Sequence, residues 1–396
     1  MKYDFDKVIE RRGTSCLKYD FQKERRGRDD LLPLWVADMD FALPKELLAD
    51  IQKRAAHGIF GYTDPKDGYF DSVIGWFERH FGWKGEKEWI TVTPGVVVAI
   101  SIAIRALTKE NDGVLIQQPV YYPFSEAIID NNRRLVNNPL VYEEGKYHID
   151  FEDFEEKIEK ENVKLFILCS PHNPVGRVWT KEELKRMGDI CLKHKVIVVA
   201  DEIHCDFTYE GFRHIMFPSI SSEFENNVVL CTAPSKTFNI AGLHVSNIFI
   251  PNPEIRKAFR HEFAAVGLSQ PNIMGLTACQ AVYEKGGEWY EQLKEYLAGN
   301  LSYVREYIEA ELKGIKLVEP EGTYLIWLDC SRLGFTSKQL ESFVEDKARL
   351  WVDFGSIFGR KSGQFIRINI ACPRATLRQA MEQLKAAYIS NGLNIV

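Results

Sequence analysis

Four polar motifs in this sequence each follow a short apolar run. They occupy residues 93–95, 170–176, 201–204 and 235–242, and they include the lysine Lys236 and the aspartate Asp201. A lysine amine becomes a nucleophile or a base at neutral pH when burial or nearby cations lower its pKa. If the apolar runs are parallel strands, the motifs meet at one edge of a sheet, where such folds bind ligands. We therefore expect one pocket with lysine chemistry.

The elements that must position these residues alternate between strands and helices. Expected strands cover 89–93, 113–117, 165–169, 196–200 and 228–232, and expected helices cover 44–57, 96–107, 124–130 and 181–194. The strands are continuous apolar runs, which is typical of strands buried on both faces. The pattern predicts an α/β fold with a mostly parallel sheet and helices on both faces.

The C-terminal part of the chain has a different pattern. A long charged helix is expected over 288–312, strands over 323–329 and 365–370, and a last helix over 376–389. This order predicts a second, smaller α+β domain. The expected boundaries are 1–44 for an N-terminal segment that joins the small domain, 45–285 for the large domain and 286–396 for the small one. No long Gly/Ser linker separates them, so we expect a large shared interface.

Composition excludes several classes of function. The 396 residues carry 50 Lys and Arg against 56 Asp and Glu, a formal net charge of -6, so nothing favours nucleic acid as a partner. No run approaches the roughly 20 apolar residues that span a membrane, and the charged residues 1–6 do not resemble a secretory signal. The eight cysteines are scattered without CxxC or metal-ligand spacing. We expect a cytoplasmic protein that binds no metal.

The order of four motifs resembles that of the fold-type I pyridoxal phosphate enzymes. These motifs are SPHNPVG at 170–176, ADEIH at 200–204, SKTFNIAGL at 235–243 and FIRINIACPR at 365–374. A lysine between Ser and Thr is by itself more often a surface residue, but the order and spacing of all four cover nearly the whole chain. The resemblance implies the transferase fold of that class and pyridoxal 5'-phosphate as cofactor.

The resemblance also implies a role for each central side chain. Lys236 would carry the covalently attached cofactor and act as general base, and Asp201 would pair with the pyridine nitrogen so that the ring accepts electrons. Asn173 would donate to the ring 3-oxygen, and Tyr121 would stack on the ring; both would also contact the substrate. Arg367 would bind the substrate α-carboxylate through a bidentate fork. Lys236, Tyr121 and Asp201 are the expected catalytic group.

A phosphate cup is expected where a glycine opens a helix, because free amides at a helix N-terminus bind anions. The resemblance implies phosphate contacts from Gly95, Val96 and Val97, with Thr232 and Ser235 as hydroxyl partners.

Three positions bear on assembly and on the branch of the family. Tyr62 resembles the tyrosine that reaches the phosphate of a neighbouring subunit, which implies a homodimer with shared sites. His204 stands where aminotransferases usually carry a tyrosine for the 3-oxygen; it would still donate there, although such a histidine is as often structural. His244 stands where the aspartate aminotransferase pattern has an arginine. The last two departures place the chain outside the main aminotransferase branch.

The segment LPLWVADMDF at 32–41 resembles the aminotransferase-like carbon–sulfur lyases of the MalY/PatB cystathionine β-lyase group. This implies β-elimination from cystathionine or related S-substituted cysteines, with release of a thiol, pyruvate and ammonia. An aminotransferase would use the same residues and is the alternative. A regulatory protein that binds the cofactor without catalysis is disfavoured, because Lys236, Asp201 and Arg367 are all present.

Overall fold

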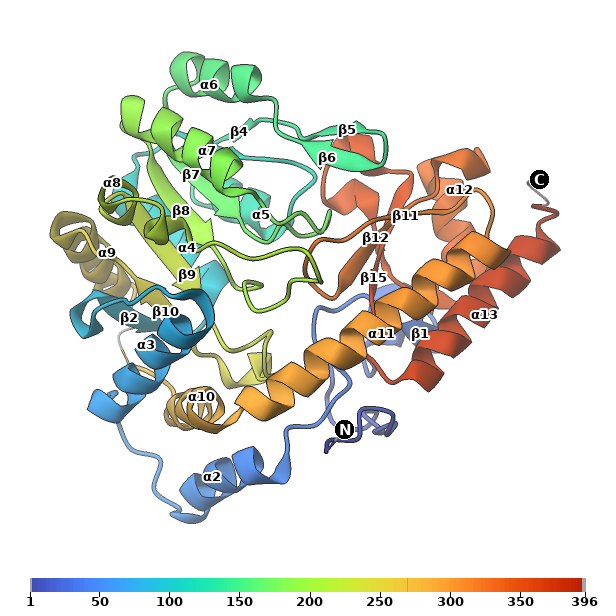
Figure 1. Cartoon of the computed structure of the whole chain (residues 1–396), viewed down its shortest axis with the longest axis horizontal. Helices are drawn as coiled ribbons and strands as arrows, with labels where there is room; N and C mark the ends of the chain where they lie inside the picture. Colours follow the sequence, from blue (N-terminus) through green and yellow to red (C-terminus); the bar gives the residue numbers. More distant parts are fainter. Residues whose placement is uncertain (1, 269, 394–396) are drawn as a thin grey trace.

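A computed structural model describes residues 2–268 and 270–393, and its largest sheet has seven strands in the order β2-β10-β9-β8-β7-β3-β4 (Figure 1). The strands are β2 (Ile90–Thr93), β3 (Gly113–Ile116), β4 (Arg134–Asn137), β7 (Val163–Cys169), β8 (Ile197–Asp201), β9 (Val228–Thr232) and β10 (Ser246–Phe249). β10 pairs in antiparallel fashion with β2 and β9, and the other four pairings of this sheet are parallel. The mostly parallel sheet is confirmed; β4 and β10 are two strands that the sequence pattern does not predict.

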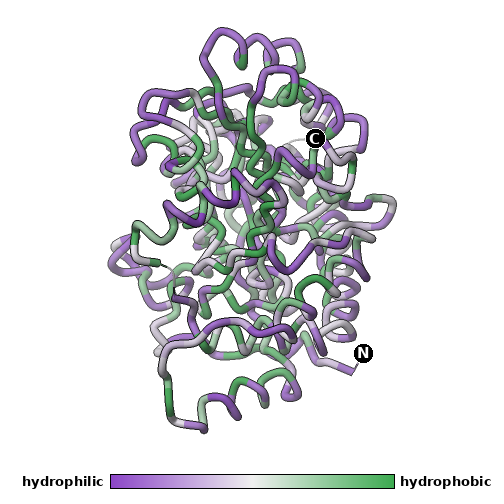
Figure 2. The backbone as a smooth tube through the Cα atoms, turned by 90° about the vertical axis from the view of Figure 1, so that its left-hand side faces the viewer, coloured by the Kyte–Doolittle hydropathy of each residue, from purple (hydrophilic) through white to green (hydrophobic). Residues whose placement is uncertain are grey.

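Alternate residues of the central strands face two different hydrophobic cores. In β7, Leu165 and Ile167 belong to one core while Phe166 and Leu168 belong to the other. The first core is covered by α4 (Val96–Leu107), α5 (Pro123–Asp130) and α9 (Pro253–Ala265). The opposite face is covered by α3 (Asp67–Phe81), α6 (Phe151–Lys160), α7 (Lys181–Lys193), α8 (Ser222–Glu225) and α10 (Ile273–Lys285). Hydrophobic backbone segments accordingly concentrate in the middle of the molecule (Figure 2).

Local sequence signals explain where these helices begin and end. Thr180 and Glu183 form a capping box at the start of α7, which satisfies two backbone amides that the helix leaves unpaired. Asp150 accepts hydrogen bonds from the first backbone amides of α6. Gly82 ends α3 with φ of 68°, a left-handed conformation that glycine adopts without strain. The helix α2 (Lys45–Ala56) follows Pro44, within one residue of the predicted range.

A second sheet of four antiparallel strands has the order β11-β12-β15-β14. Its strands are β11 (Lys316–Val318), β12 (Leu325–Asp329), β14 (Asp353–Phe354) and β15 (Phe365–Asn369). The long helices α11 (Gly287–Glu311) and α13 (Arg374–Ser390) lie side by side along it (Figure 1), and α12 (Ser337–Ser342) stands beyond them. The expected α+β region is therefore present, while the residue numbers of the domain boundaries stay a prediction.

The N-terminal segment joins this second region. After the short helix α1 (Gln22–Arg26), β1 (Leu32–Pro33) pairs in parallel with β13 (Leu350–Trp351). The chain then runs from residue 34 to 41 between the four-stranded sheet and the loop after β9. A small hairpin of β5 (Val141–Glu143) and β6 (Lys146–His148) lies at the other side of that sheet. Within the described residues, no helix has both the length and the apolar character required to cross a membrane.

Candidate active site

The carboxyl ends of the central strands bring three of the four predicted motifs together. Asp201 is the last residue of β8 and stands in register with Cys169 at the end of β7 and with Cys231 in β9. The loop that carries Asn173 follows β7, and the loop that carries Lys236 follows β9. This is the sheet edge at which α/β folds bind ligands.

Asp201 is a buried carboxyl group with an unusual proton affinity. It is 5% exposed, and burial raises its pKa from 3.8 to about 7, although the backbone amide of Ile203 and the charge of Lys236 oppose this rise. The amide of Ile203 donates to Oδ1 at 3.2 Å. A carboxylate held out of water gains from a cationic partner, so Asp201 is suited to hold a protonated ring nitrogen.

Lys236 is the amine nearest to the expected chemistry. Its Nζ donates to the carbonyl oxygen of Ala37 at 2.8 Å. Burial lowers the pKa of Lys236 from 10.5 to about 8; Asp38 and Asp201 raise it, and Arg367 lowers it further. A substantial fraction of the amine is therefore neutral near pH 7.5, as nucleophilic attack or proton abstraction requires.

Arg367 reaches the site from the second sheet. It is 3% exposed, donates from one Nη to Oδ1 of Asn173 at 2.9 Å, and from the other to the carbonyl of Trp35 at 2.8 Å. The same guanidinium forms an ion pair with Asp353, its cross-strand neighbour on β14. Asp353 neutralises the charge of the Arg367 guanidinium, and three groups hold the guanidinium in place. A guanidinium held in this way can release one of these groups and bind a ligand carboxylate instead.

Asn173 and Tyr121 belong to one connected loop pair. The carbonyl of Asn173 accepts from the amide of Tyr121 at 3.0 Å, and the Asn173 side chain is buried. Because its Oδ1 accepts from Arg367, its NH₂ is left as the donor, which is the group expected for a cofactor oxygen. Tyr121 is half-buried; burial raises its pKa, and the nearby Arg367 and Asp201 also act on it.

His204 lies in the same pocket as a neutral side chain. It is buried, and burial first, then the charges of Lys236 and Arg367, lower its pKa well below 6.5. Among the described residues, its Nδ1 and the Nε of Arg367 are buried and have no hydrogen-bond partner. Such atoms are costly unless a ligand satisfies them. This observation fits a polar cofactor beside Lys236 and Asp201.

The expected phosphate cup corresponds to the start of α4. Gly95 precedes the helix without a side-chain cap, and no described atom lies within 4 Å of the place where its Cβ would stand. Val96 is buried and Val97 is 38% exposed. Both side chains are apolar, so the backbone amides are the groups that could bind an anion here. Ser235, the expected hydroxyl partner, is partly buried in the loop that carries Lys236.

Thr232 is less suited to the phosphate than expected. It is fully buried in β9, and its hydroxyl donates to the carbonyl of Asn247 on β10 at 2.8 Å. That hydroxyl proton is thus used inside the sheet.

Tyr62 and His244 lie on the surface of this chain. Tyr62 is 95% exposed on the segment between α2 and α3 (Figure 1), next to the exposed Ile59 and Phe60. An exposed apolar cluster of this kind is common in an interface. His244 is exposed in a left-handed turn with φ of 48° after a short 3₁₀ helix, and it lines the same cavity as Lys236.

Three groups of the site are not found by sequence reasoning. The carbonyl of Ala37 receives hydrogen bonds from Lys236 and, at 3.1 Å, from the hydroxyl of Tyr324, and Asp353 compensates Arg367. The motif at 32–41 is the available signal for Ala37. A main-chain carbonyl is present in every residue, however, so residue types do not reveal which one accepts the hydrogen bond. Trp35 in the same motif stacks on Trp351 with ring centroids 4.5 Å apart, which accounts for its presence.

One group outside this pocket has the geometry of metal ligands. Glu155, Glu159 and His194 have ligand atoms within 4.8 Å of one another in the described part of the chain. Glu155 is also paired with Lys193 at 2.7 Å, so this group forms a charged surface cluster between α6 and the end of α7.

The fold and the site together define a fold-type I enzyme of the pyridoxal phosphate class. The chain belongs to the aminotransferase class I and II family, whose sequence profile matches residues 29–384.

Individual relatives narrow this further. Over 384 residues, the chain is 43% identical to the cystathionine beta-lyase PatB of Bacillus subtilis, covering 97% of this chain and 99% of that protein. The crystal structure of cystalysin from Treponema denticola, which contains a pyridoxal 5'-phosphate cofactor, is 38% identical with a TM-score of 0.95 and covers 99% of this chain and 100% of cystalysin. The C-S lyase from Staphylococcus hominis with bound pyridoxal phosphate is 34% identical with a TM-score of 0.91, over 98% of both chains.

Proposed function

We propose that this protein is a pyridoxal phosphate-dependent carbon–sulfur β-lyase that converts cystathionine or related S-substituted cysteines to a thiol, pyruvate and ammonia. The observation that carries the proposal is the meeting of Lys236, Asp201 and Arg367. Asp201 and Lys236 follow the neighbouring strands β8 and β9 at one edge of the sheet, and the charges of Asp201 and Arg367 both act on the Lys236 amine. The 43% identity to a cystathionine beta-lyase over nearly the whole chain favours elimination over transamination.

Lys236 moves the proton in the proposed reaction. When bound, pyridoxal phosphate supplies the electron sink for the pair left on the substrate α-carbon. With a pKa of about 8, the nitrogen of Lys236 can take the α-proton as a base and hold it as an acid near the same pH. The negative charge of Asp201 would keep a proton on the ring nitrogen. Burial strengthens this effect, because water screens the charge less in the interior.

Arg367 orients the amino-acid substrate. Its guanidinium binds the α-carboxylate in place of one of its present partners, Asp353 being the anionic one. Asn173 keeps the plane of the guanidinium fixed through its 2.9 Å hydrogen bond. This arrangement selects α-amino acids and holds the α-carbon in one orientation.

Assembly and location are further parts of the proposal. We infer a homodimer in which Tyr62 reaches the phosphate of the partner's site, supported by the 95% exposure of this tyrosine beside the exposed Ile59 and Phe60. We also infer a cytoplasmic location, supported by the eight cysteines, all of which are free thiols in the described chain.

The test is to incubate the purified protein with cystathionine and pyridoxal phosphate, without any keto acid, and to measure pyruvate. We expect stoichiometric pyruvate and thiol, and a loss of at least about 100-fold in the Lys236→Ala variant, the size of a lost general base. Conversion of the cofactor to its amine form without pyruvate would instead identify an aminotransferase. No turnover and no spectral change would identify a protein that binds the cofactor without catalysis.

A further inference from the structure

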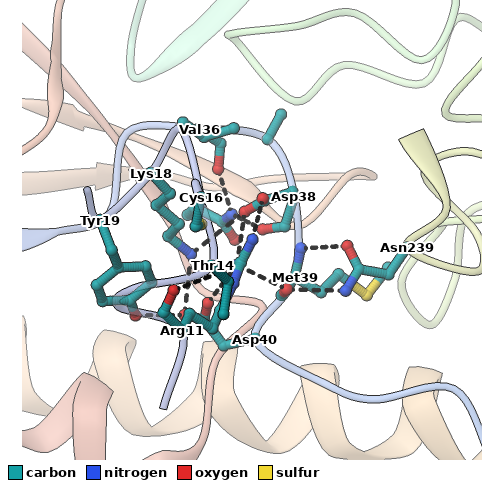
Figure 3. Close-up of polar contacts among 12 residues, drawn as sticks. Arg11, Thr14, Cys16, Lys18, Tyr19, Val36, Asp38, Met39, Asp40 and Asn239 are labelled. Atoms are coloured by element: carbon teal, nitrogen blue, oxygen red, sulfur yellow. Dashed lines mark hydrogen bonds and ion pairs between the residues drawn. The ribbon is translucent and has the colours of Figure 1, made fainter. Parts of the chain in front are cut away.

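A cluster of four charged residues lies beside the lysine. It consists of Arg11, Lys18, Asp38 and Asp40, and we call it the N-terminal ion cluster. Arg11 contacts Asp38 at 2.6 Å and Asp40 at 2.7 Å, and Lys18 contacts Asp40 at 2.9 Å and Asp38 at 3.6 Å. In Figure 3 both cations point toward the two carboxylates. Two positive and two negative charges make the cluster neutral as a whole.

The cluster is built into the interior. Lys18 has no exposed surface and Asp40 is 5% exposed. Burial alone would lower the pKa of Lys18, but the charges of Asp40 and Asp38 outweigh it and raise that pKa. Tyr19 adds a hydrogen bond from its hydroxyl to Asp40 at 3.1 Å. Removal of one of the four charged groups therefore leaves an opposite charge in the interior without its partner.

The segment that carries Asp38 and Asp40 also carries the acceptor for Lys236. Ala37 lies directly before Asp38, and its carbonyl oxygen accepts from Lys236 Nζ at 2.8 Å. Asn369 donates to the carbonyl of Val36 at 2.6 Å, and Arg11 donates to the carbonyl of Met39 at 3.1 Å. The backbone on either side of Ala37 is thus held by side chains from distant parts of the chain.

A second anchor comes from the lysine loop itself. Asn239, three residues after Lys236, accepts from the amide of Met39 at 2.9 Å and donates to the carbonyl of Met39 at 2.8 Å (Figure 3). It also donates to the carbonyl of Phe41 at 3.0 Å. The lysine loop and the 36–41 segment are therefore one hydrogen-bonded unit.

Arg11 and Asp38 share a cavity with Lys236. This cavity has a volume of about 620 Å³ and is lined by Arg11, Asp38, Asp40, Asn239, His244 and Lys236 among others. Removing a charge from Arg11 or Asp38 therefore changes the field in the space into which the lysine faces.

We propose that the N-terminal ion cluster is a positioning group for Lys236, which fixes the Ala37 carbonyl on the lysine nitrogen and sets the net charge that this nitrogen faces. Arg11 and Asp38 are its two adjustable charges. Neither contacts substrate in this role; both act through Lys236. The catalytic role of Lys236 in this inference rests on the proposed function. The effect of Arg11 and Asp38 on the proton affinity of Lys236 does not.

The charged and titratable groups around the two partners define what is to be measured. Lys236 is affected by Asp38, Asp201 and Arg367 and acts in turn on His204. On the other side of Asp38 stand Arg11 and Lys18, with Tyr324 close enough to respond to its charge. Tyr19 and Cys372 border Asp40. Of these groups, only Arg11 and Asp38 are exchanged in the test.

The test compares two variants of opposite charge effect, Asp38→Asn and Arg11→Met. Loss of the Asp38 charge lowers the pH at which the Lys236 nitrogen loses its proton, and loss of the Arg11 charge raises it, each by on the order of one pH unit. Arg11→Lys keeps the charge and restores the wild-type value. Lys84→Gln is the matched control, because Lys84 is exposed and, among the described residues, forms an ion pair only with the exposed Glu78 at 3.3 Å.

Two readouts are used. In the apoprotein, the rate at which cyanate carbamylates Lys236 is followed against pH by peptide mass spectrometry; in the holoenzyme, the pH midpoint of the cofactor absorption band is followed. Opposite shifts in the two variants support the proposal. Shifts in the same direction, or no shift, overturn the proposal. A loss of folding would change both variants in the same way, and thermal unfolding of each variant detects it. Absence of a cofactor band would count against the proposed function alone, since the carbamylation profile does not depend on it.

Discussion

Arg367 of β15 donates a 2.9 Å hydrogen bond to the side-chain oxygen of Asn173, 194 residues earlier in the chain. This contact ties the second sheet to the loop after β7. Because the Asn173 oxygen accepts this bond, the NH₂ of the same amide remains available as a donor. The proposed substrate anchor and the proposed cofactor donor are therefore coupled, and we expect a change at one to alter the other.

Replacement of Arg367 tests the carboxylate anchor. We expect Arg367→Ala to raise KM for cystathionine by roughly 100-fold, because two charge-assisted hydrogen bonds are lost. Arg367→Lys should recover only part of the affinity, since an ammonium cannot form the fork. Steady-state kinetics measure both. Arg360→Ala, an exposed position, serves as control, and an unchanged KM in Arg367→Ala would refute the assignment.

Replacement of Asp353 separates stability from binding. In Asp353→Asn the buried Arg367 loses its only ion-pair partner among the described residues, so we expect the free energy of unfolding to fall by about 3 kcal/mol. KM should not rise, because the substrate carboxylate no longer competes with Asp353. Urea unfolding and steady-state kinetics measure the two effects. In the control Asp346→Asn, an exposed pair with Arg28 is lost, and stability should change by less than about 1 kcal/mol.

Asp201 should make the stability of the apoprotein depend on pH. Its pKa is raised from 3.8 to about 7 in the folded chain, so the folded state binds this proton more tightly than the unfolded state does. The resulting stability is present below pH 4 and is lost as pH rises toward 7. Asp201→Asn lacks this term, so the variant should gain about 3 kcal/mol relative to wild type between pH 5 and pH 8. A constant difference in urea unfolding over that range would contradict the assignment.

Mixed dimers test whether Tyr62 acts across subunits. Tyr62→Ala and Lys236→Ala chains, each inactive or nearly so, are combined by refolding or co-expression. If Tyr62 serves the partner's site, the mixed dimer has one site with both residues intact, and the mixture recovers roughly a quarter of wild-type activity. If Tyr62 serves its own chain, the mixture stays as inactive as the separate variants. Size-exclusion chromatography confirms that mixed dimers are present.

Much of the fold follows from local patterns. The range 96–107 was predicted as a helix and is α4, and 228–232 was predicted as a strand and is β9, because an apolar run bounded by polar turns permits few alternatives. β4 and β10 were not predicted. β4 is a half-exposed edge strand in which polar and apolar residues are mixed. β10 follows a loop with a glycine and a histidine, and these residues give no clear signal for the start of a strand.

The site was predictable only where chemistry depends on residue type. Lys236, Asp201 and Asn173 stand after strands, and the topology of a parallel sheet brings such positions together. Asp353 and Tyr324 were missed because their roles come from cross-strand register in the second sheet, which local patterns do not determine. Thr232 was expected to face a phosphate, but whether a hydroxyl at a strand end turns outward or bonds to the next strand depends on β10, which was not predicted.

The acceptor for Lys236 is a peptide oxygen, so every amino acid at position 37 supplies it. In a mutational scan, substitutions at position 37 would therefore change activity only through the size of the new side chain. The scan would not detect the hydrogen bond between the residue 37 carbonyl and Lys236. Sensitivity would appear instead at Arg11, Asn239 and Asn369, which are 26, 202 and 332 positions away along the chain and hold the flanking backbone. We therefore expect the substitutions that disturb the lysine nitrogen to include many at positions that never touch it.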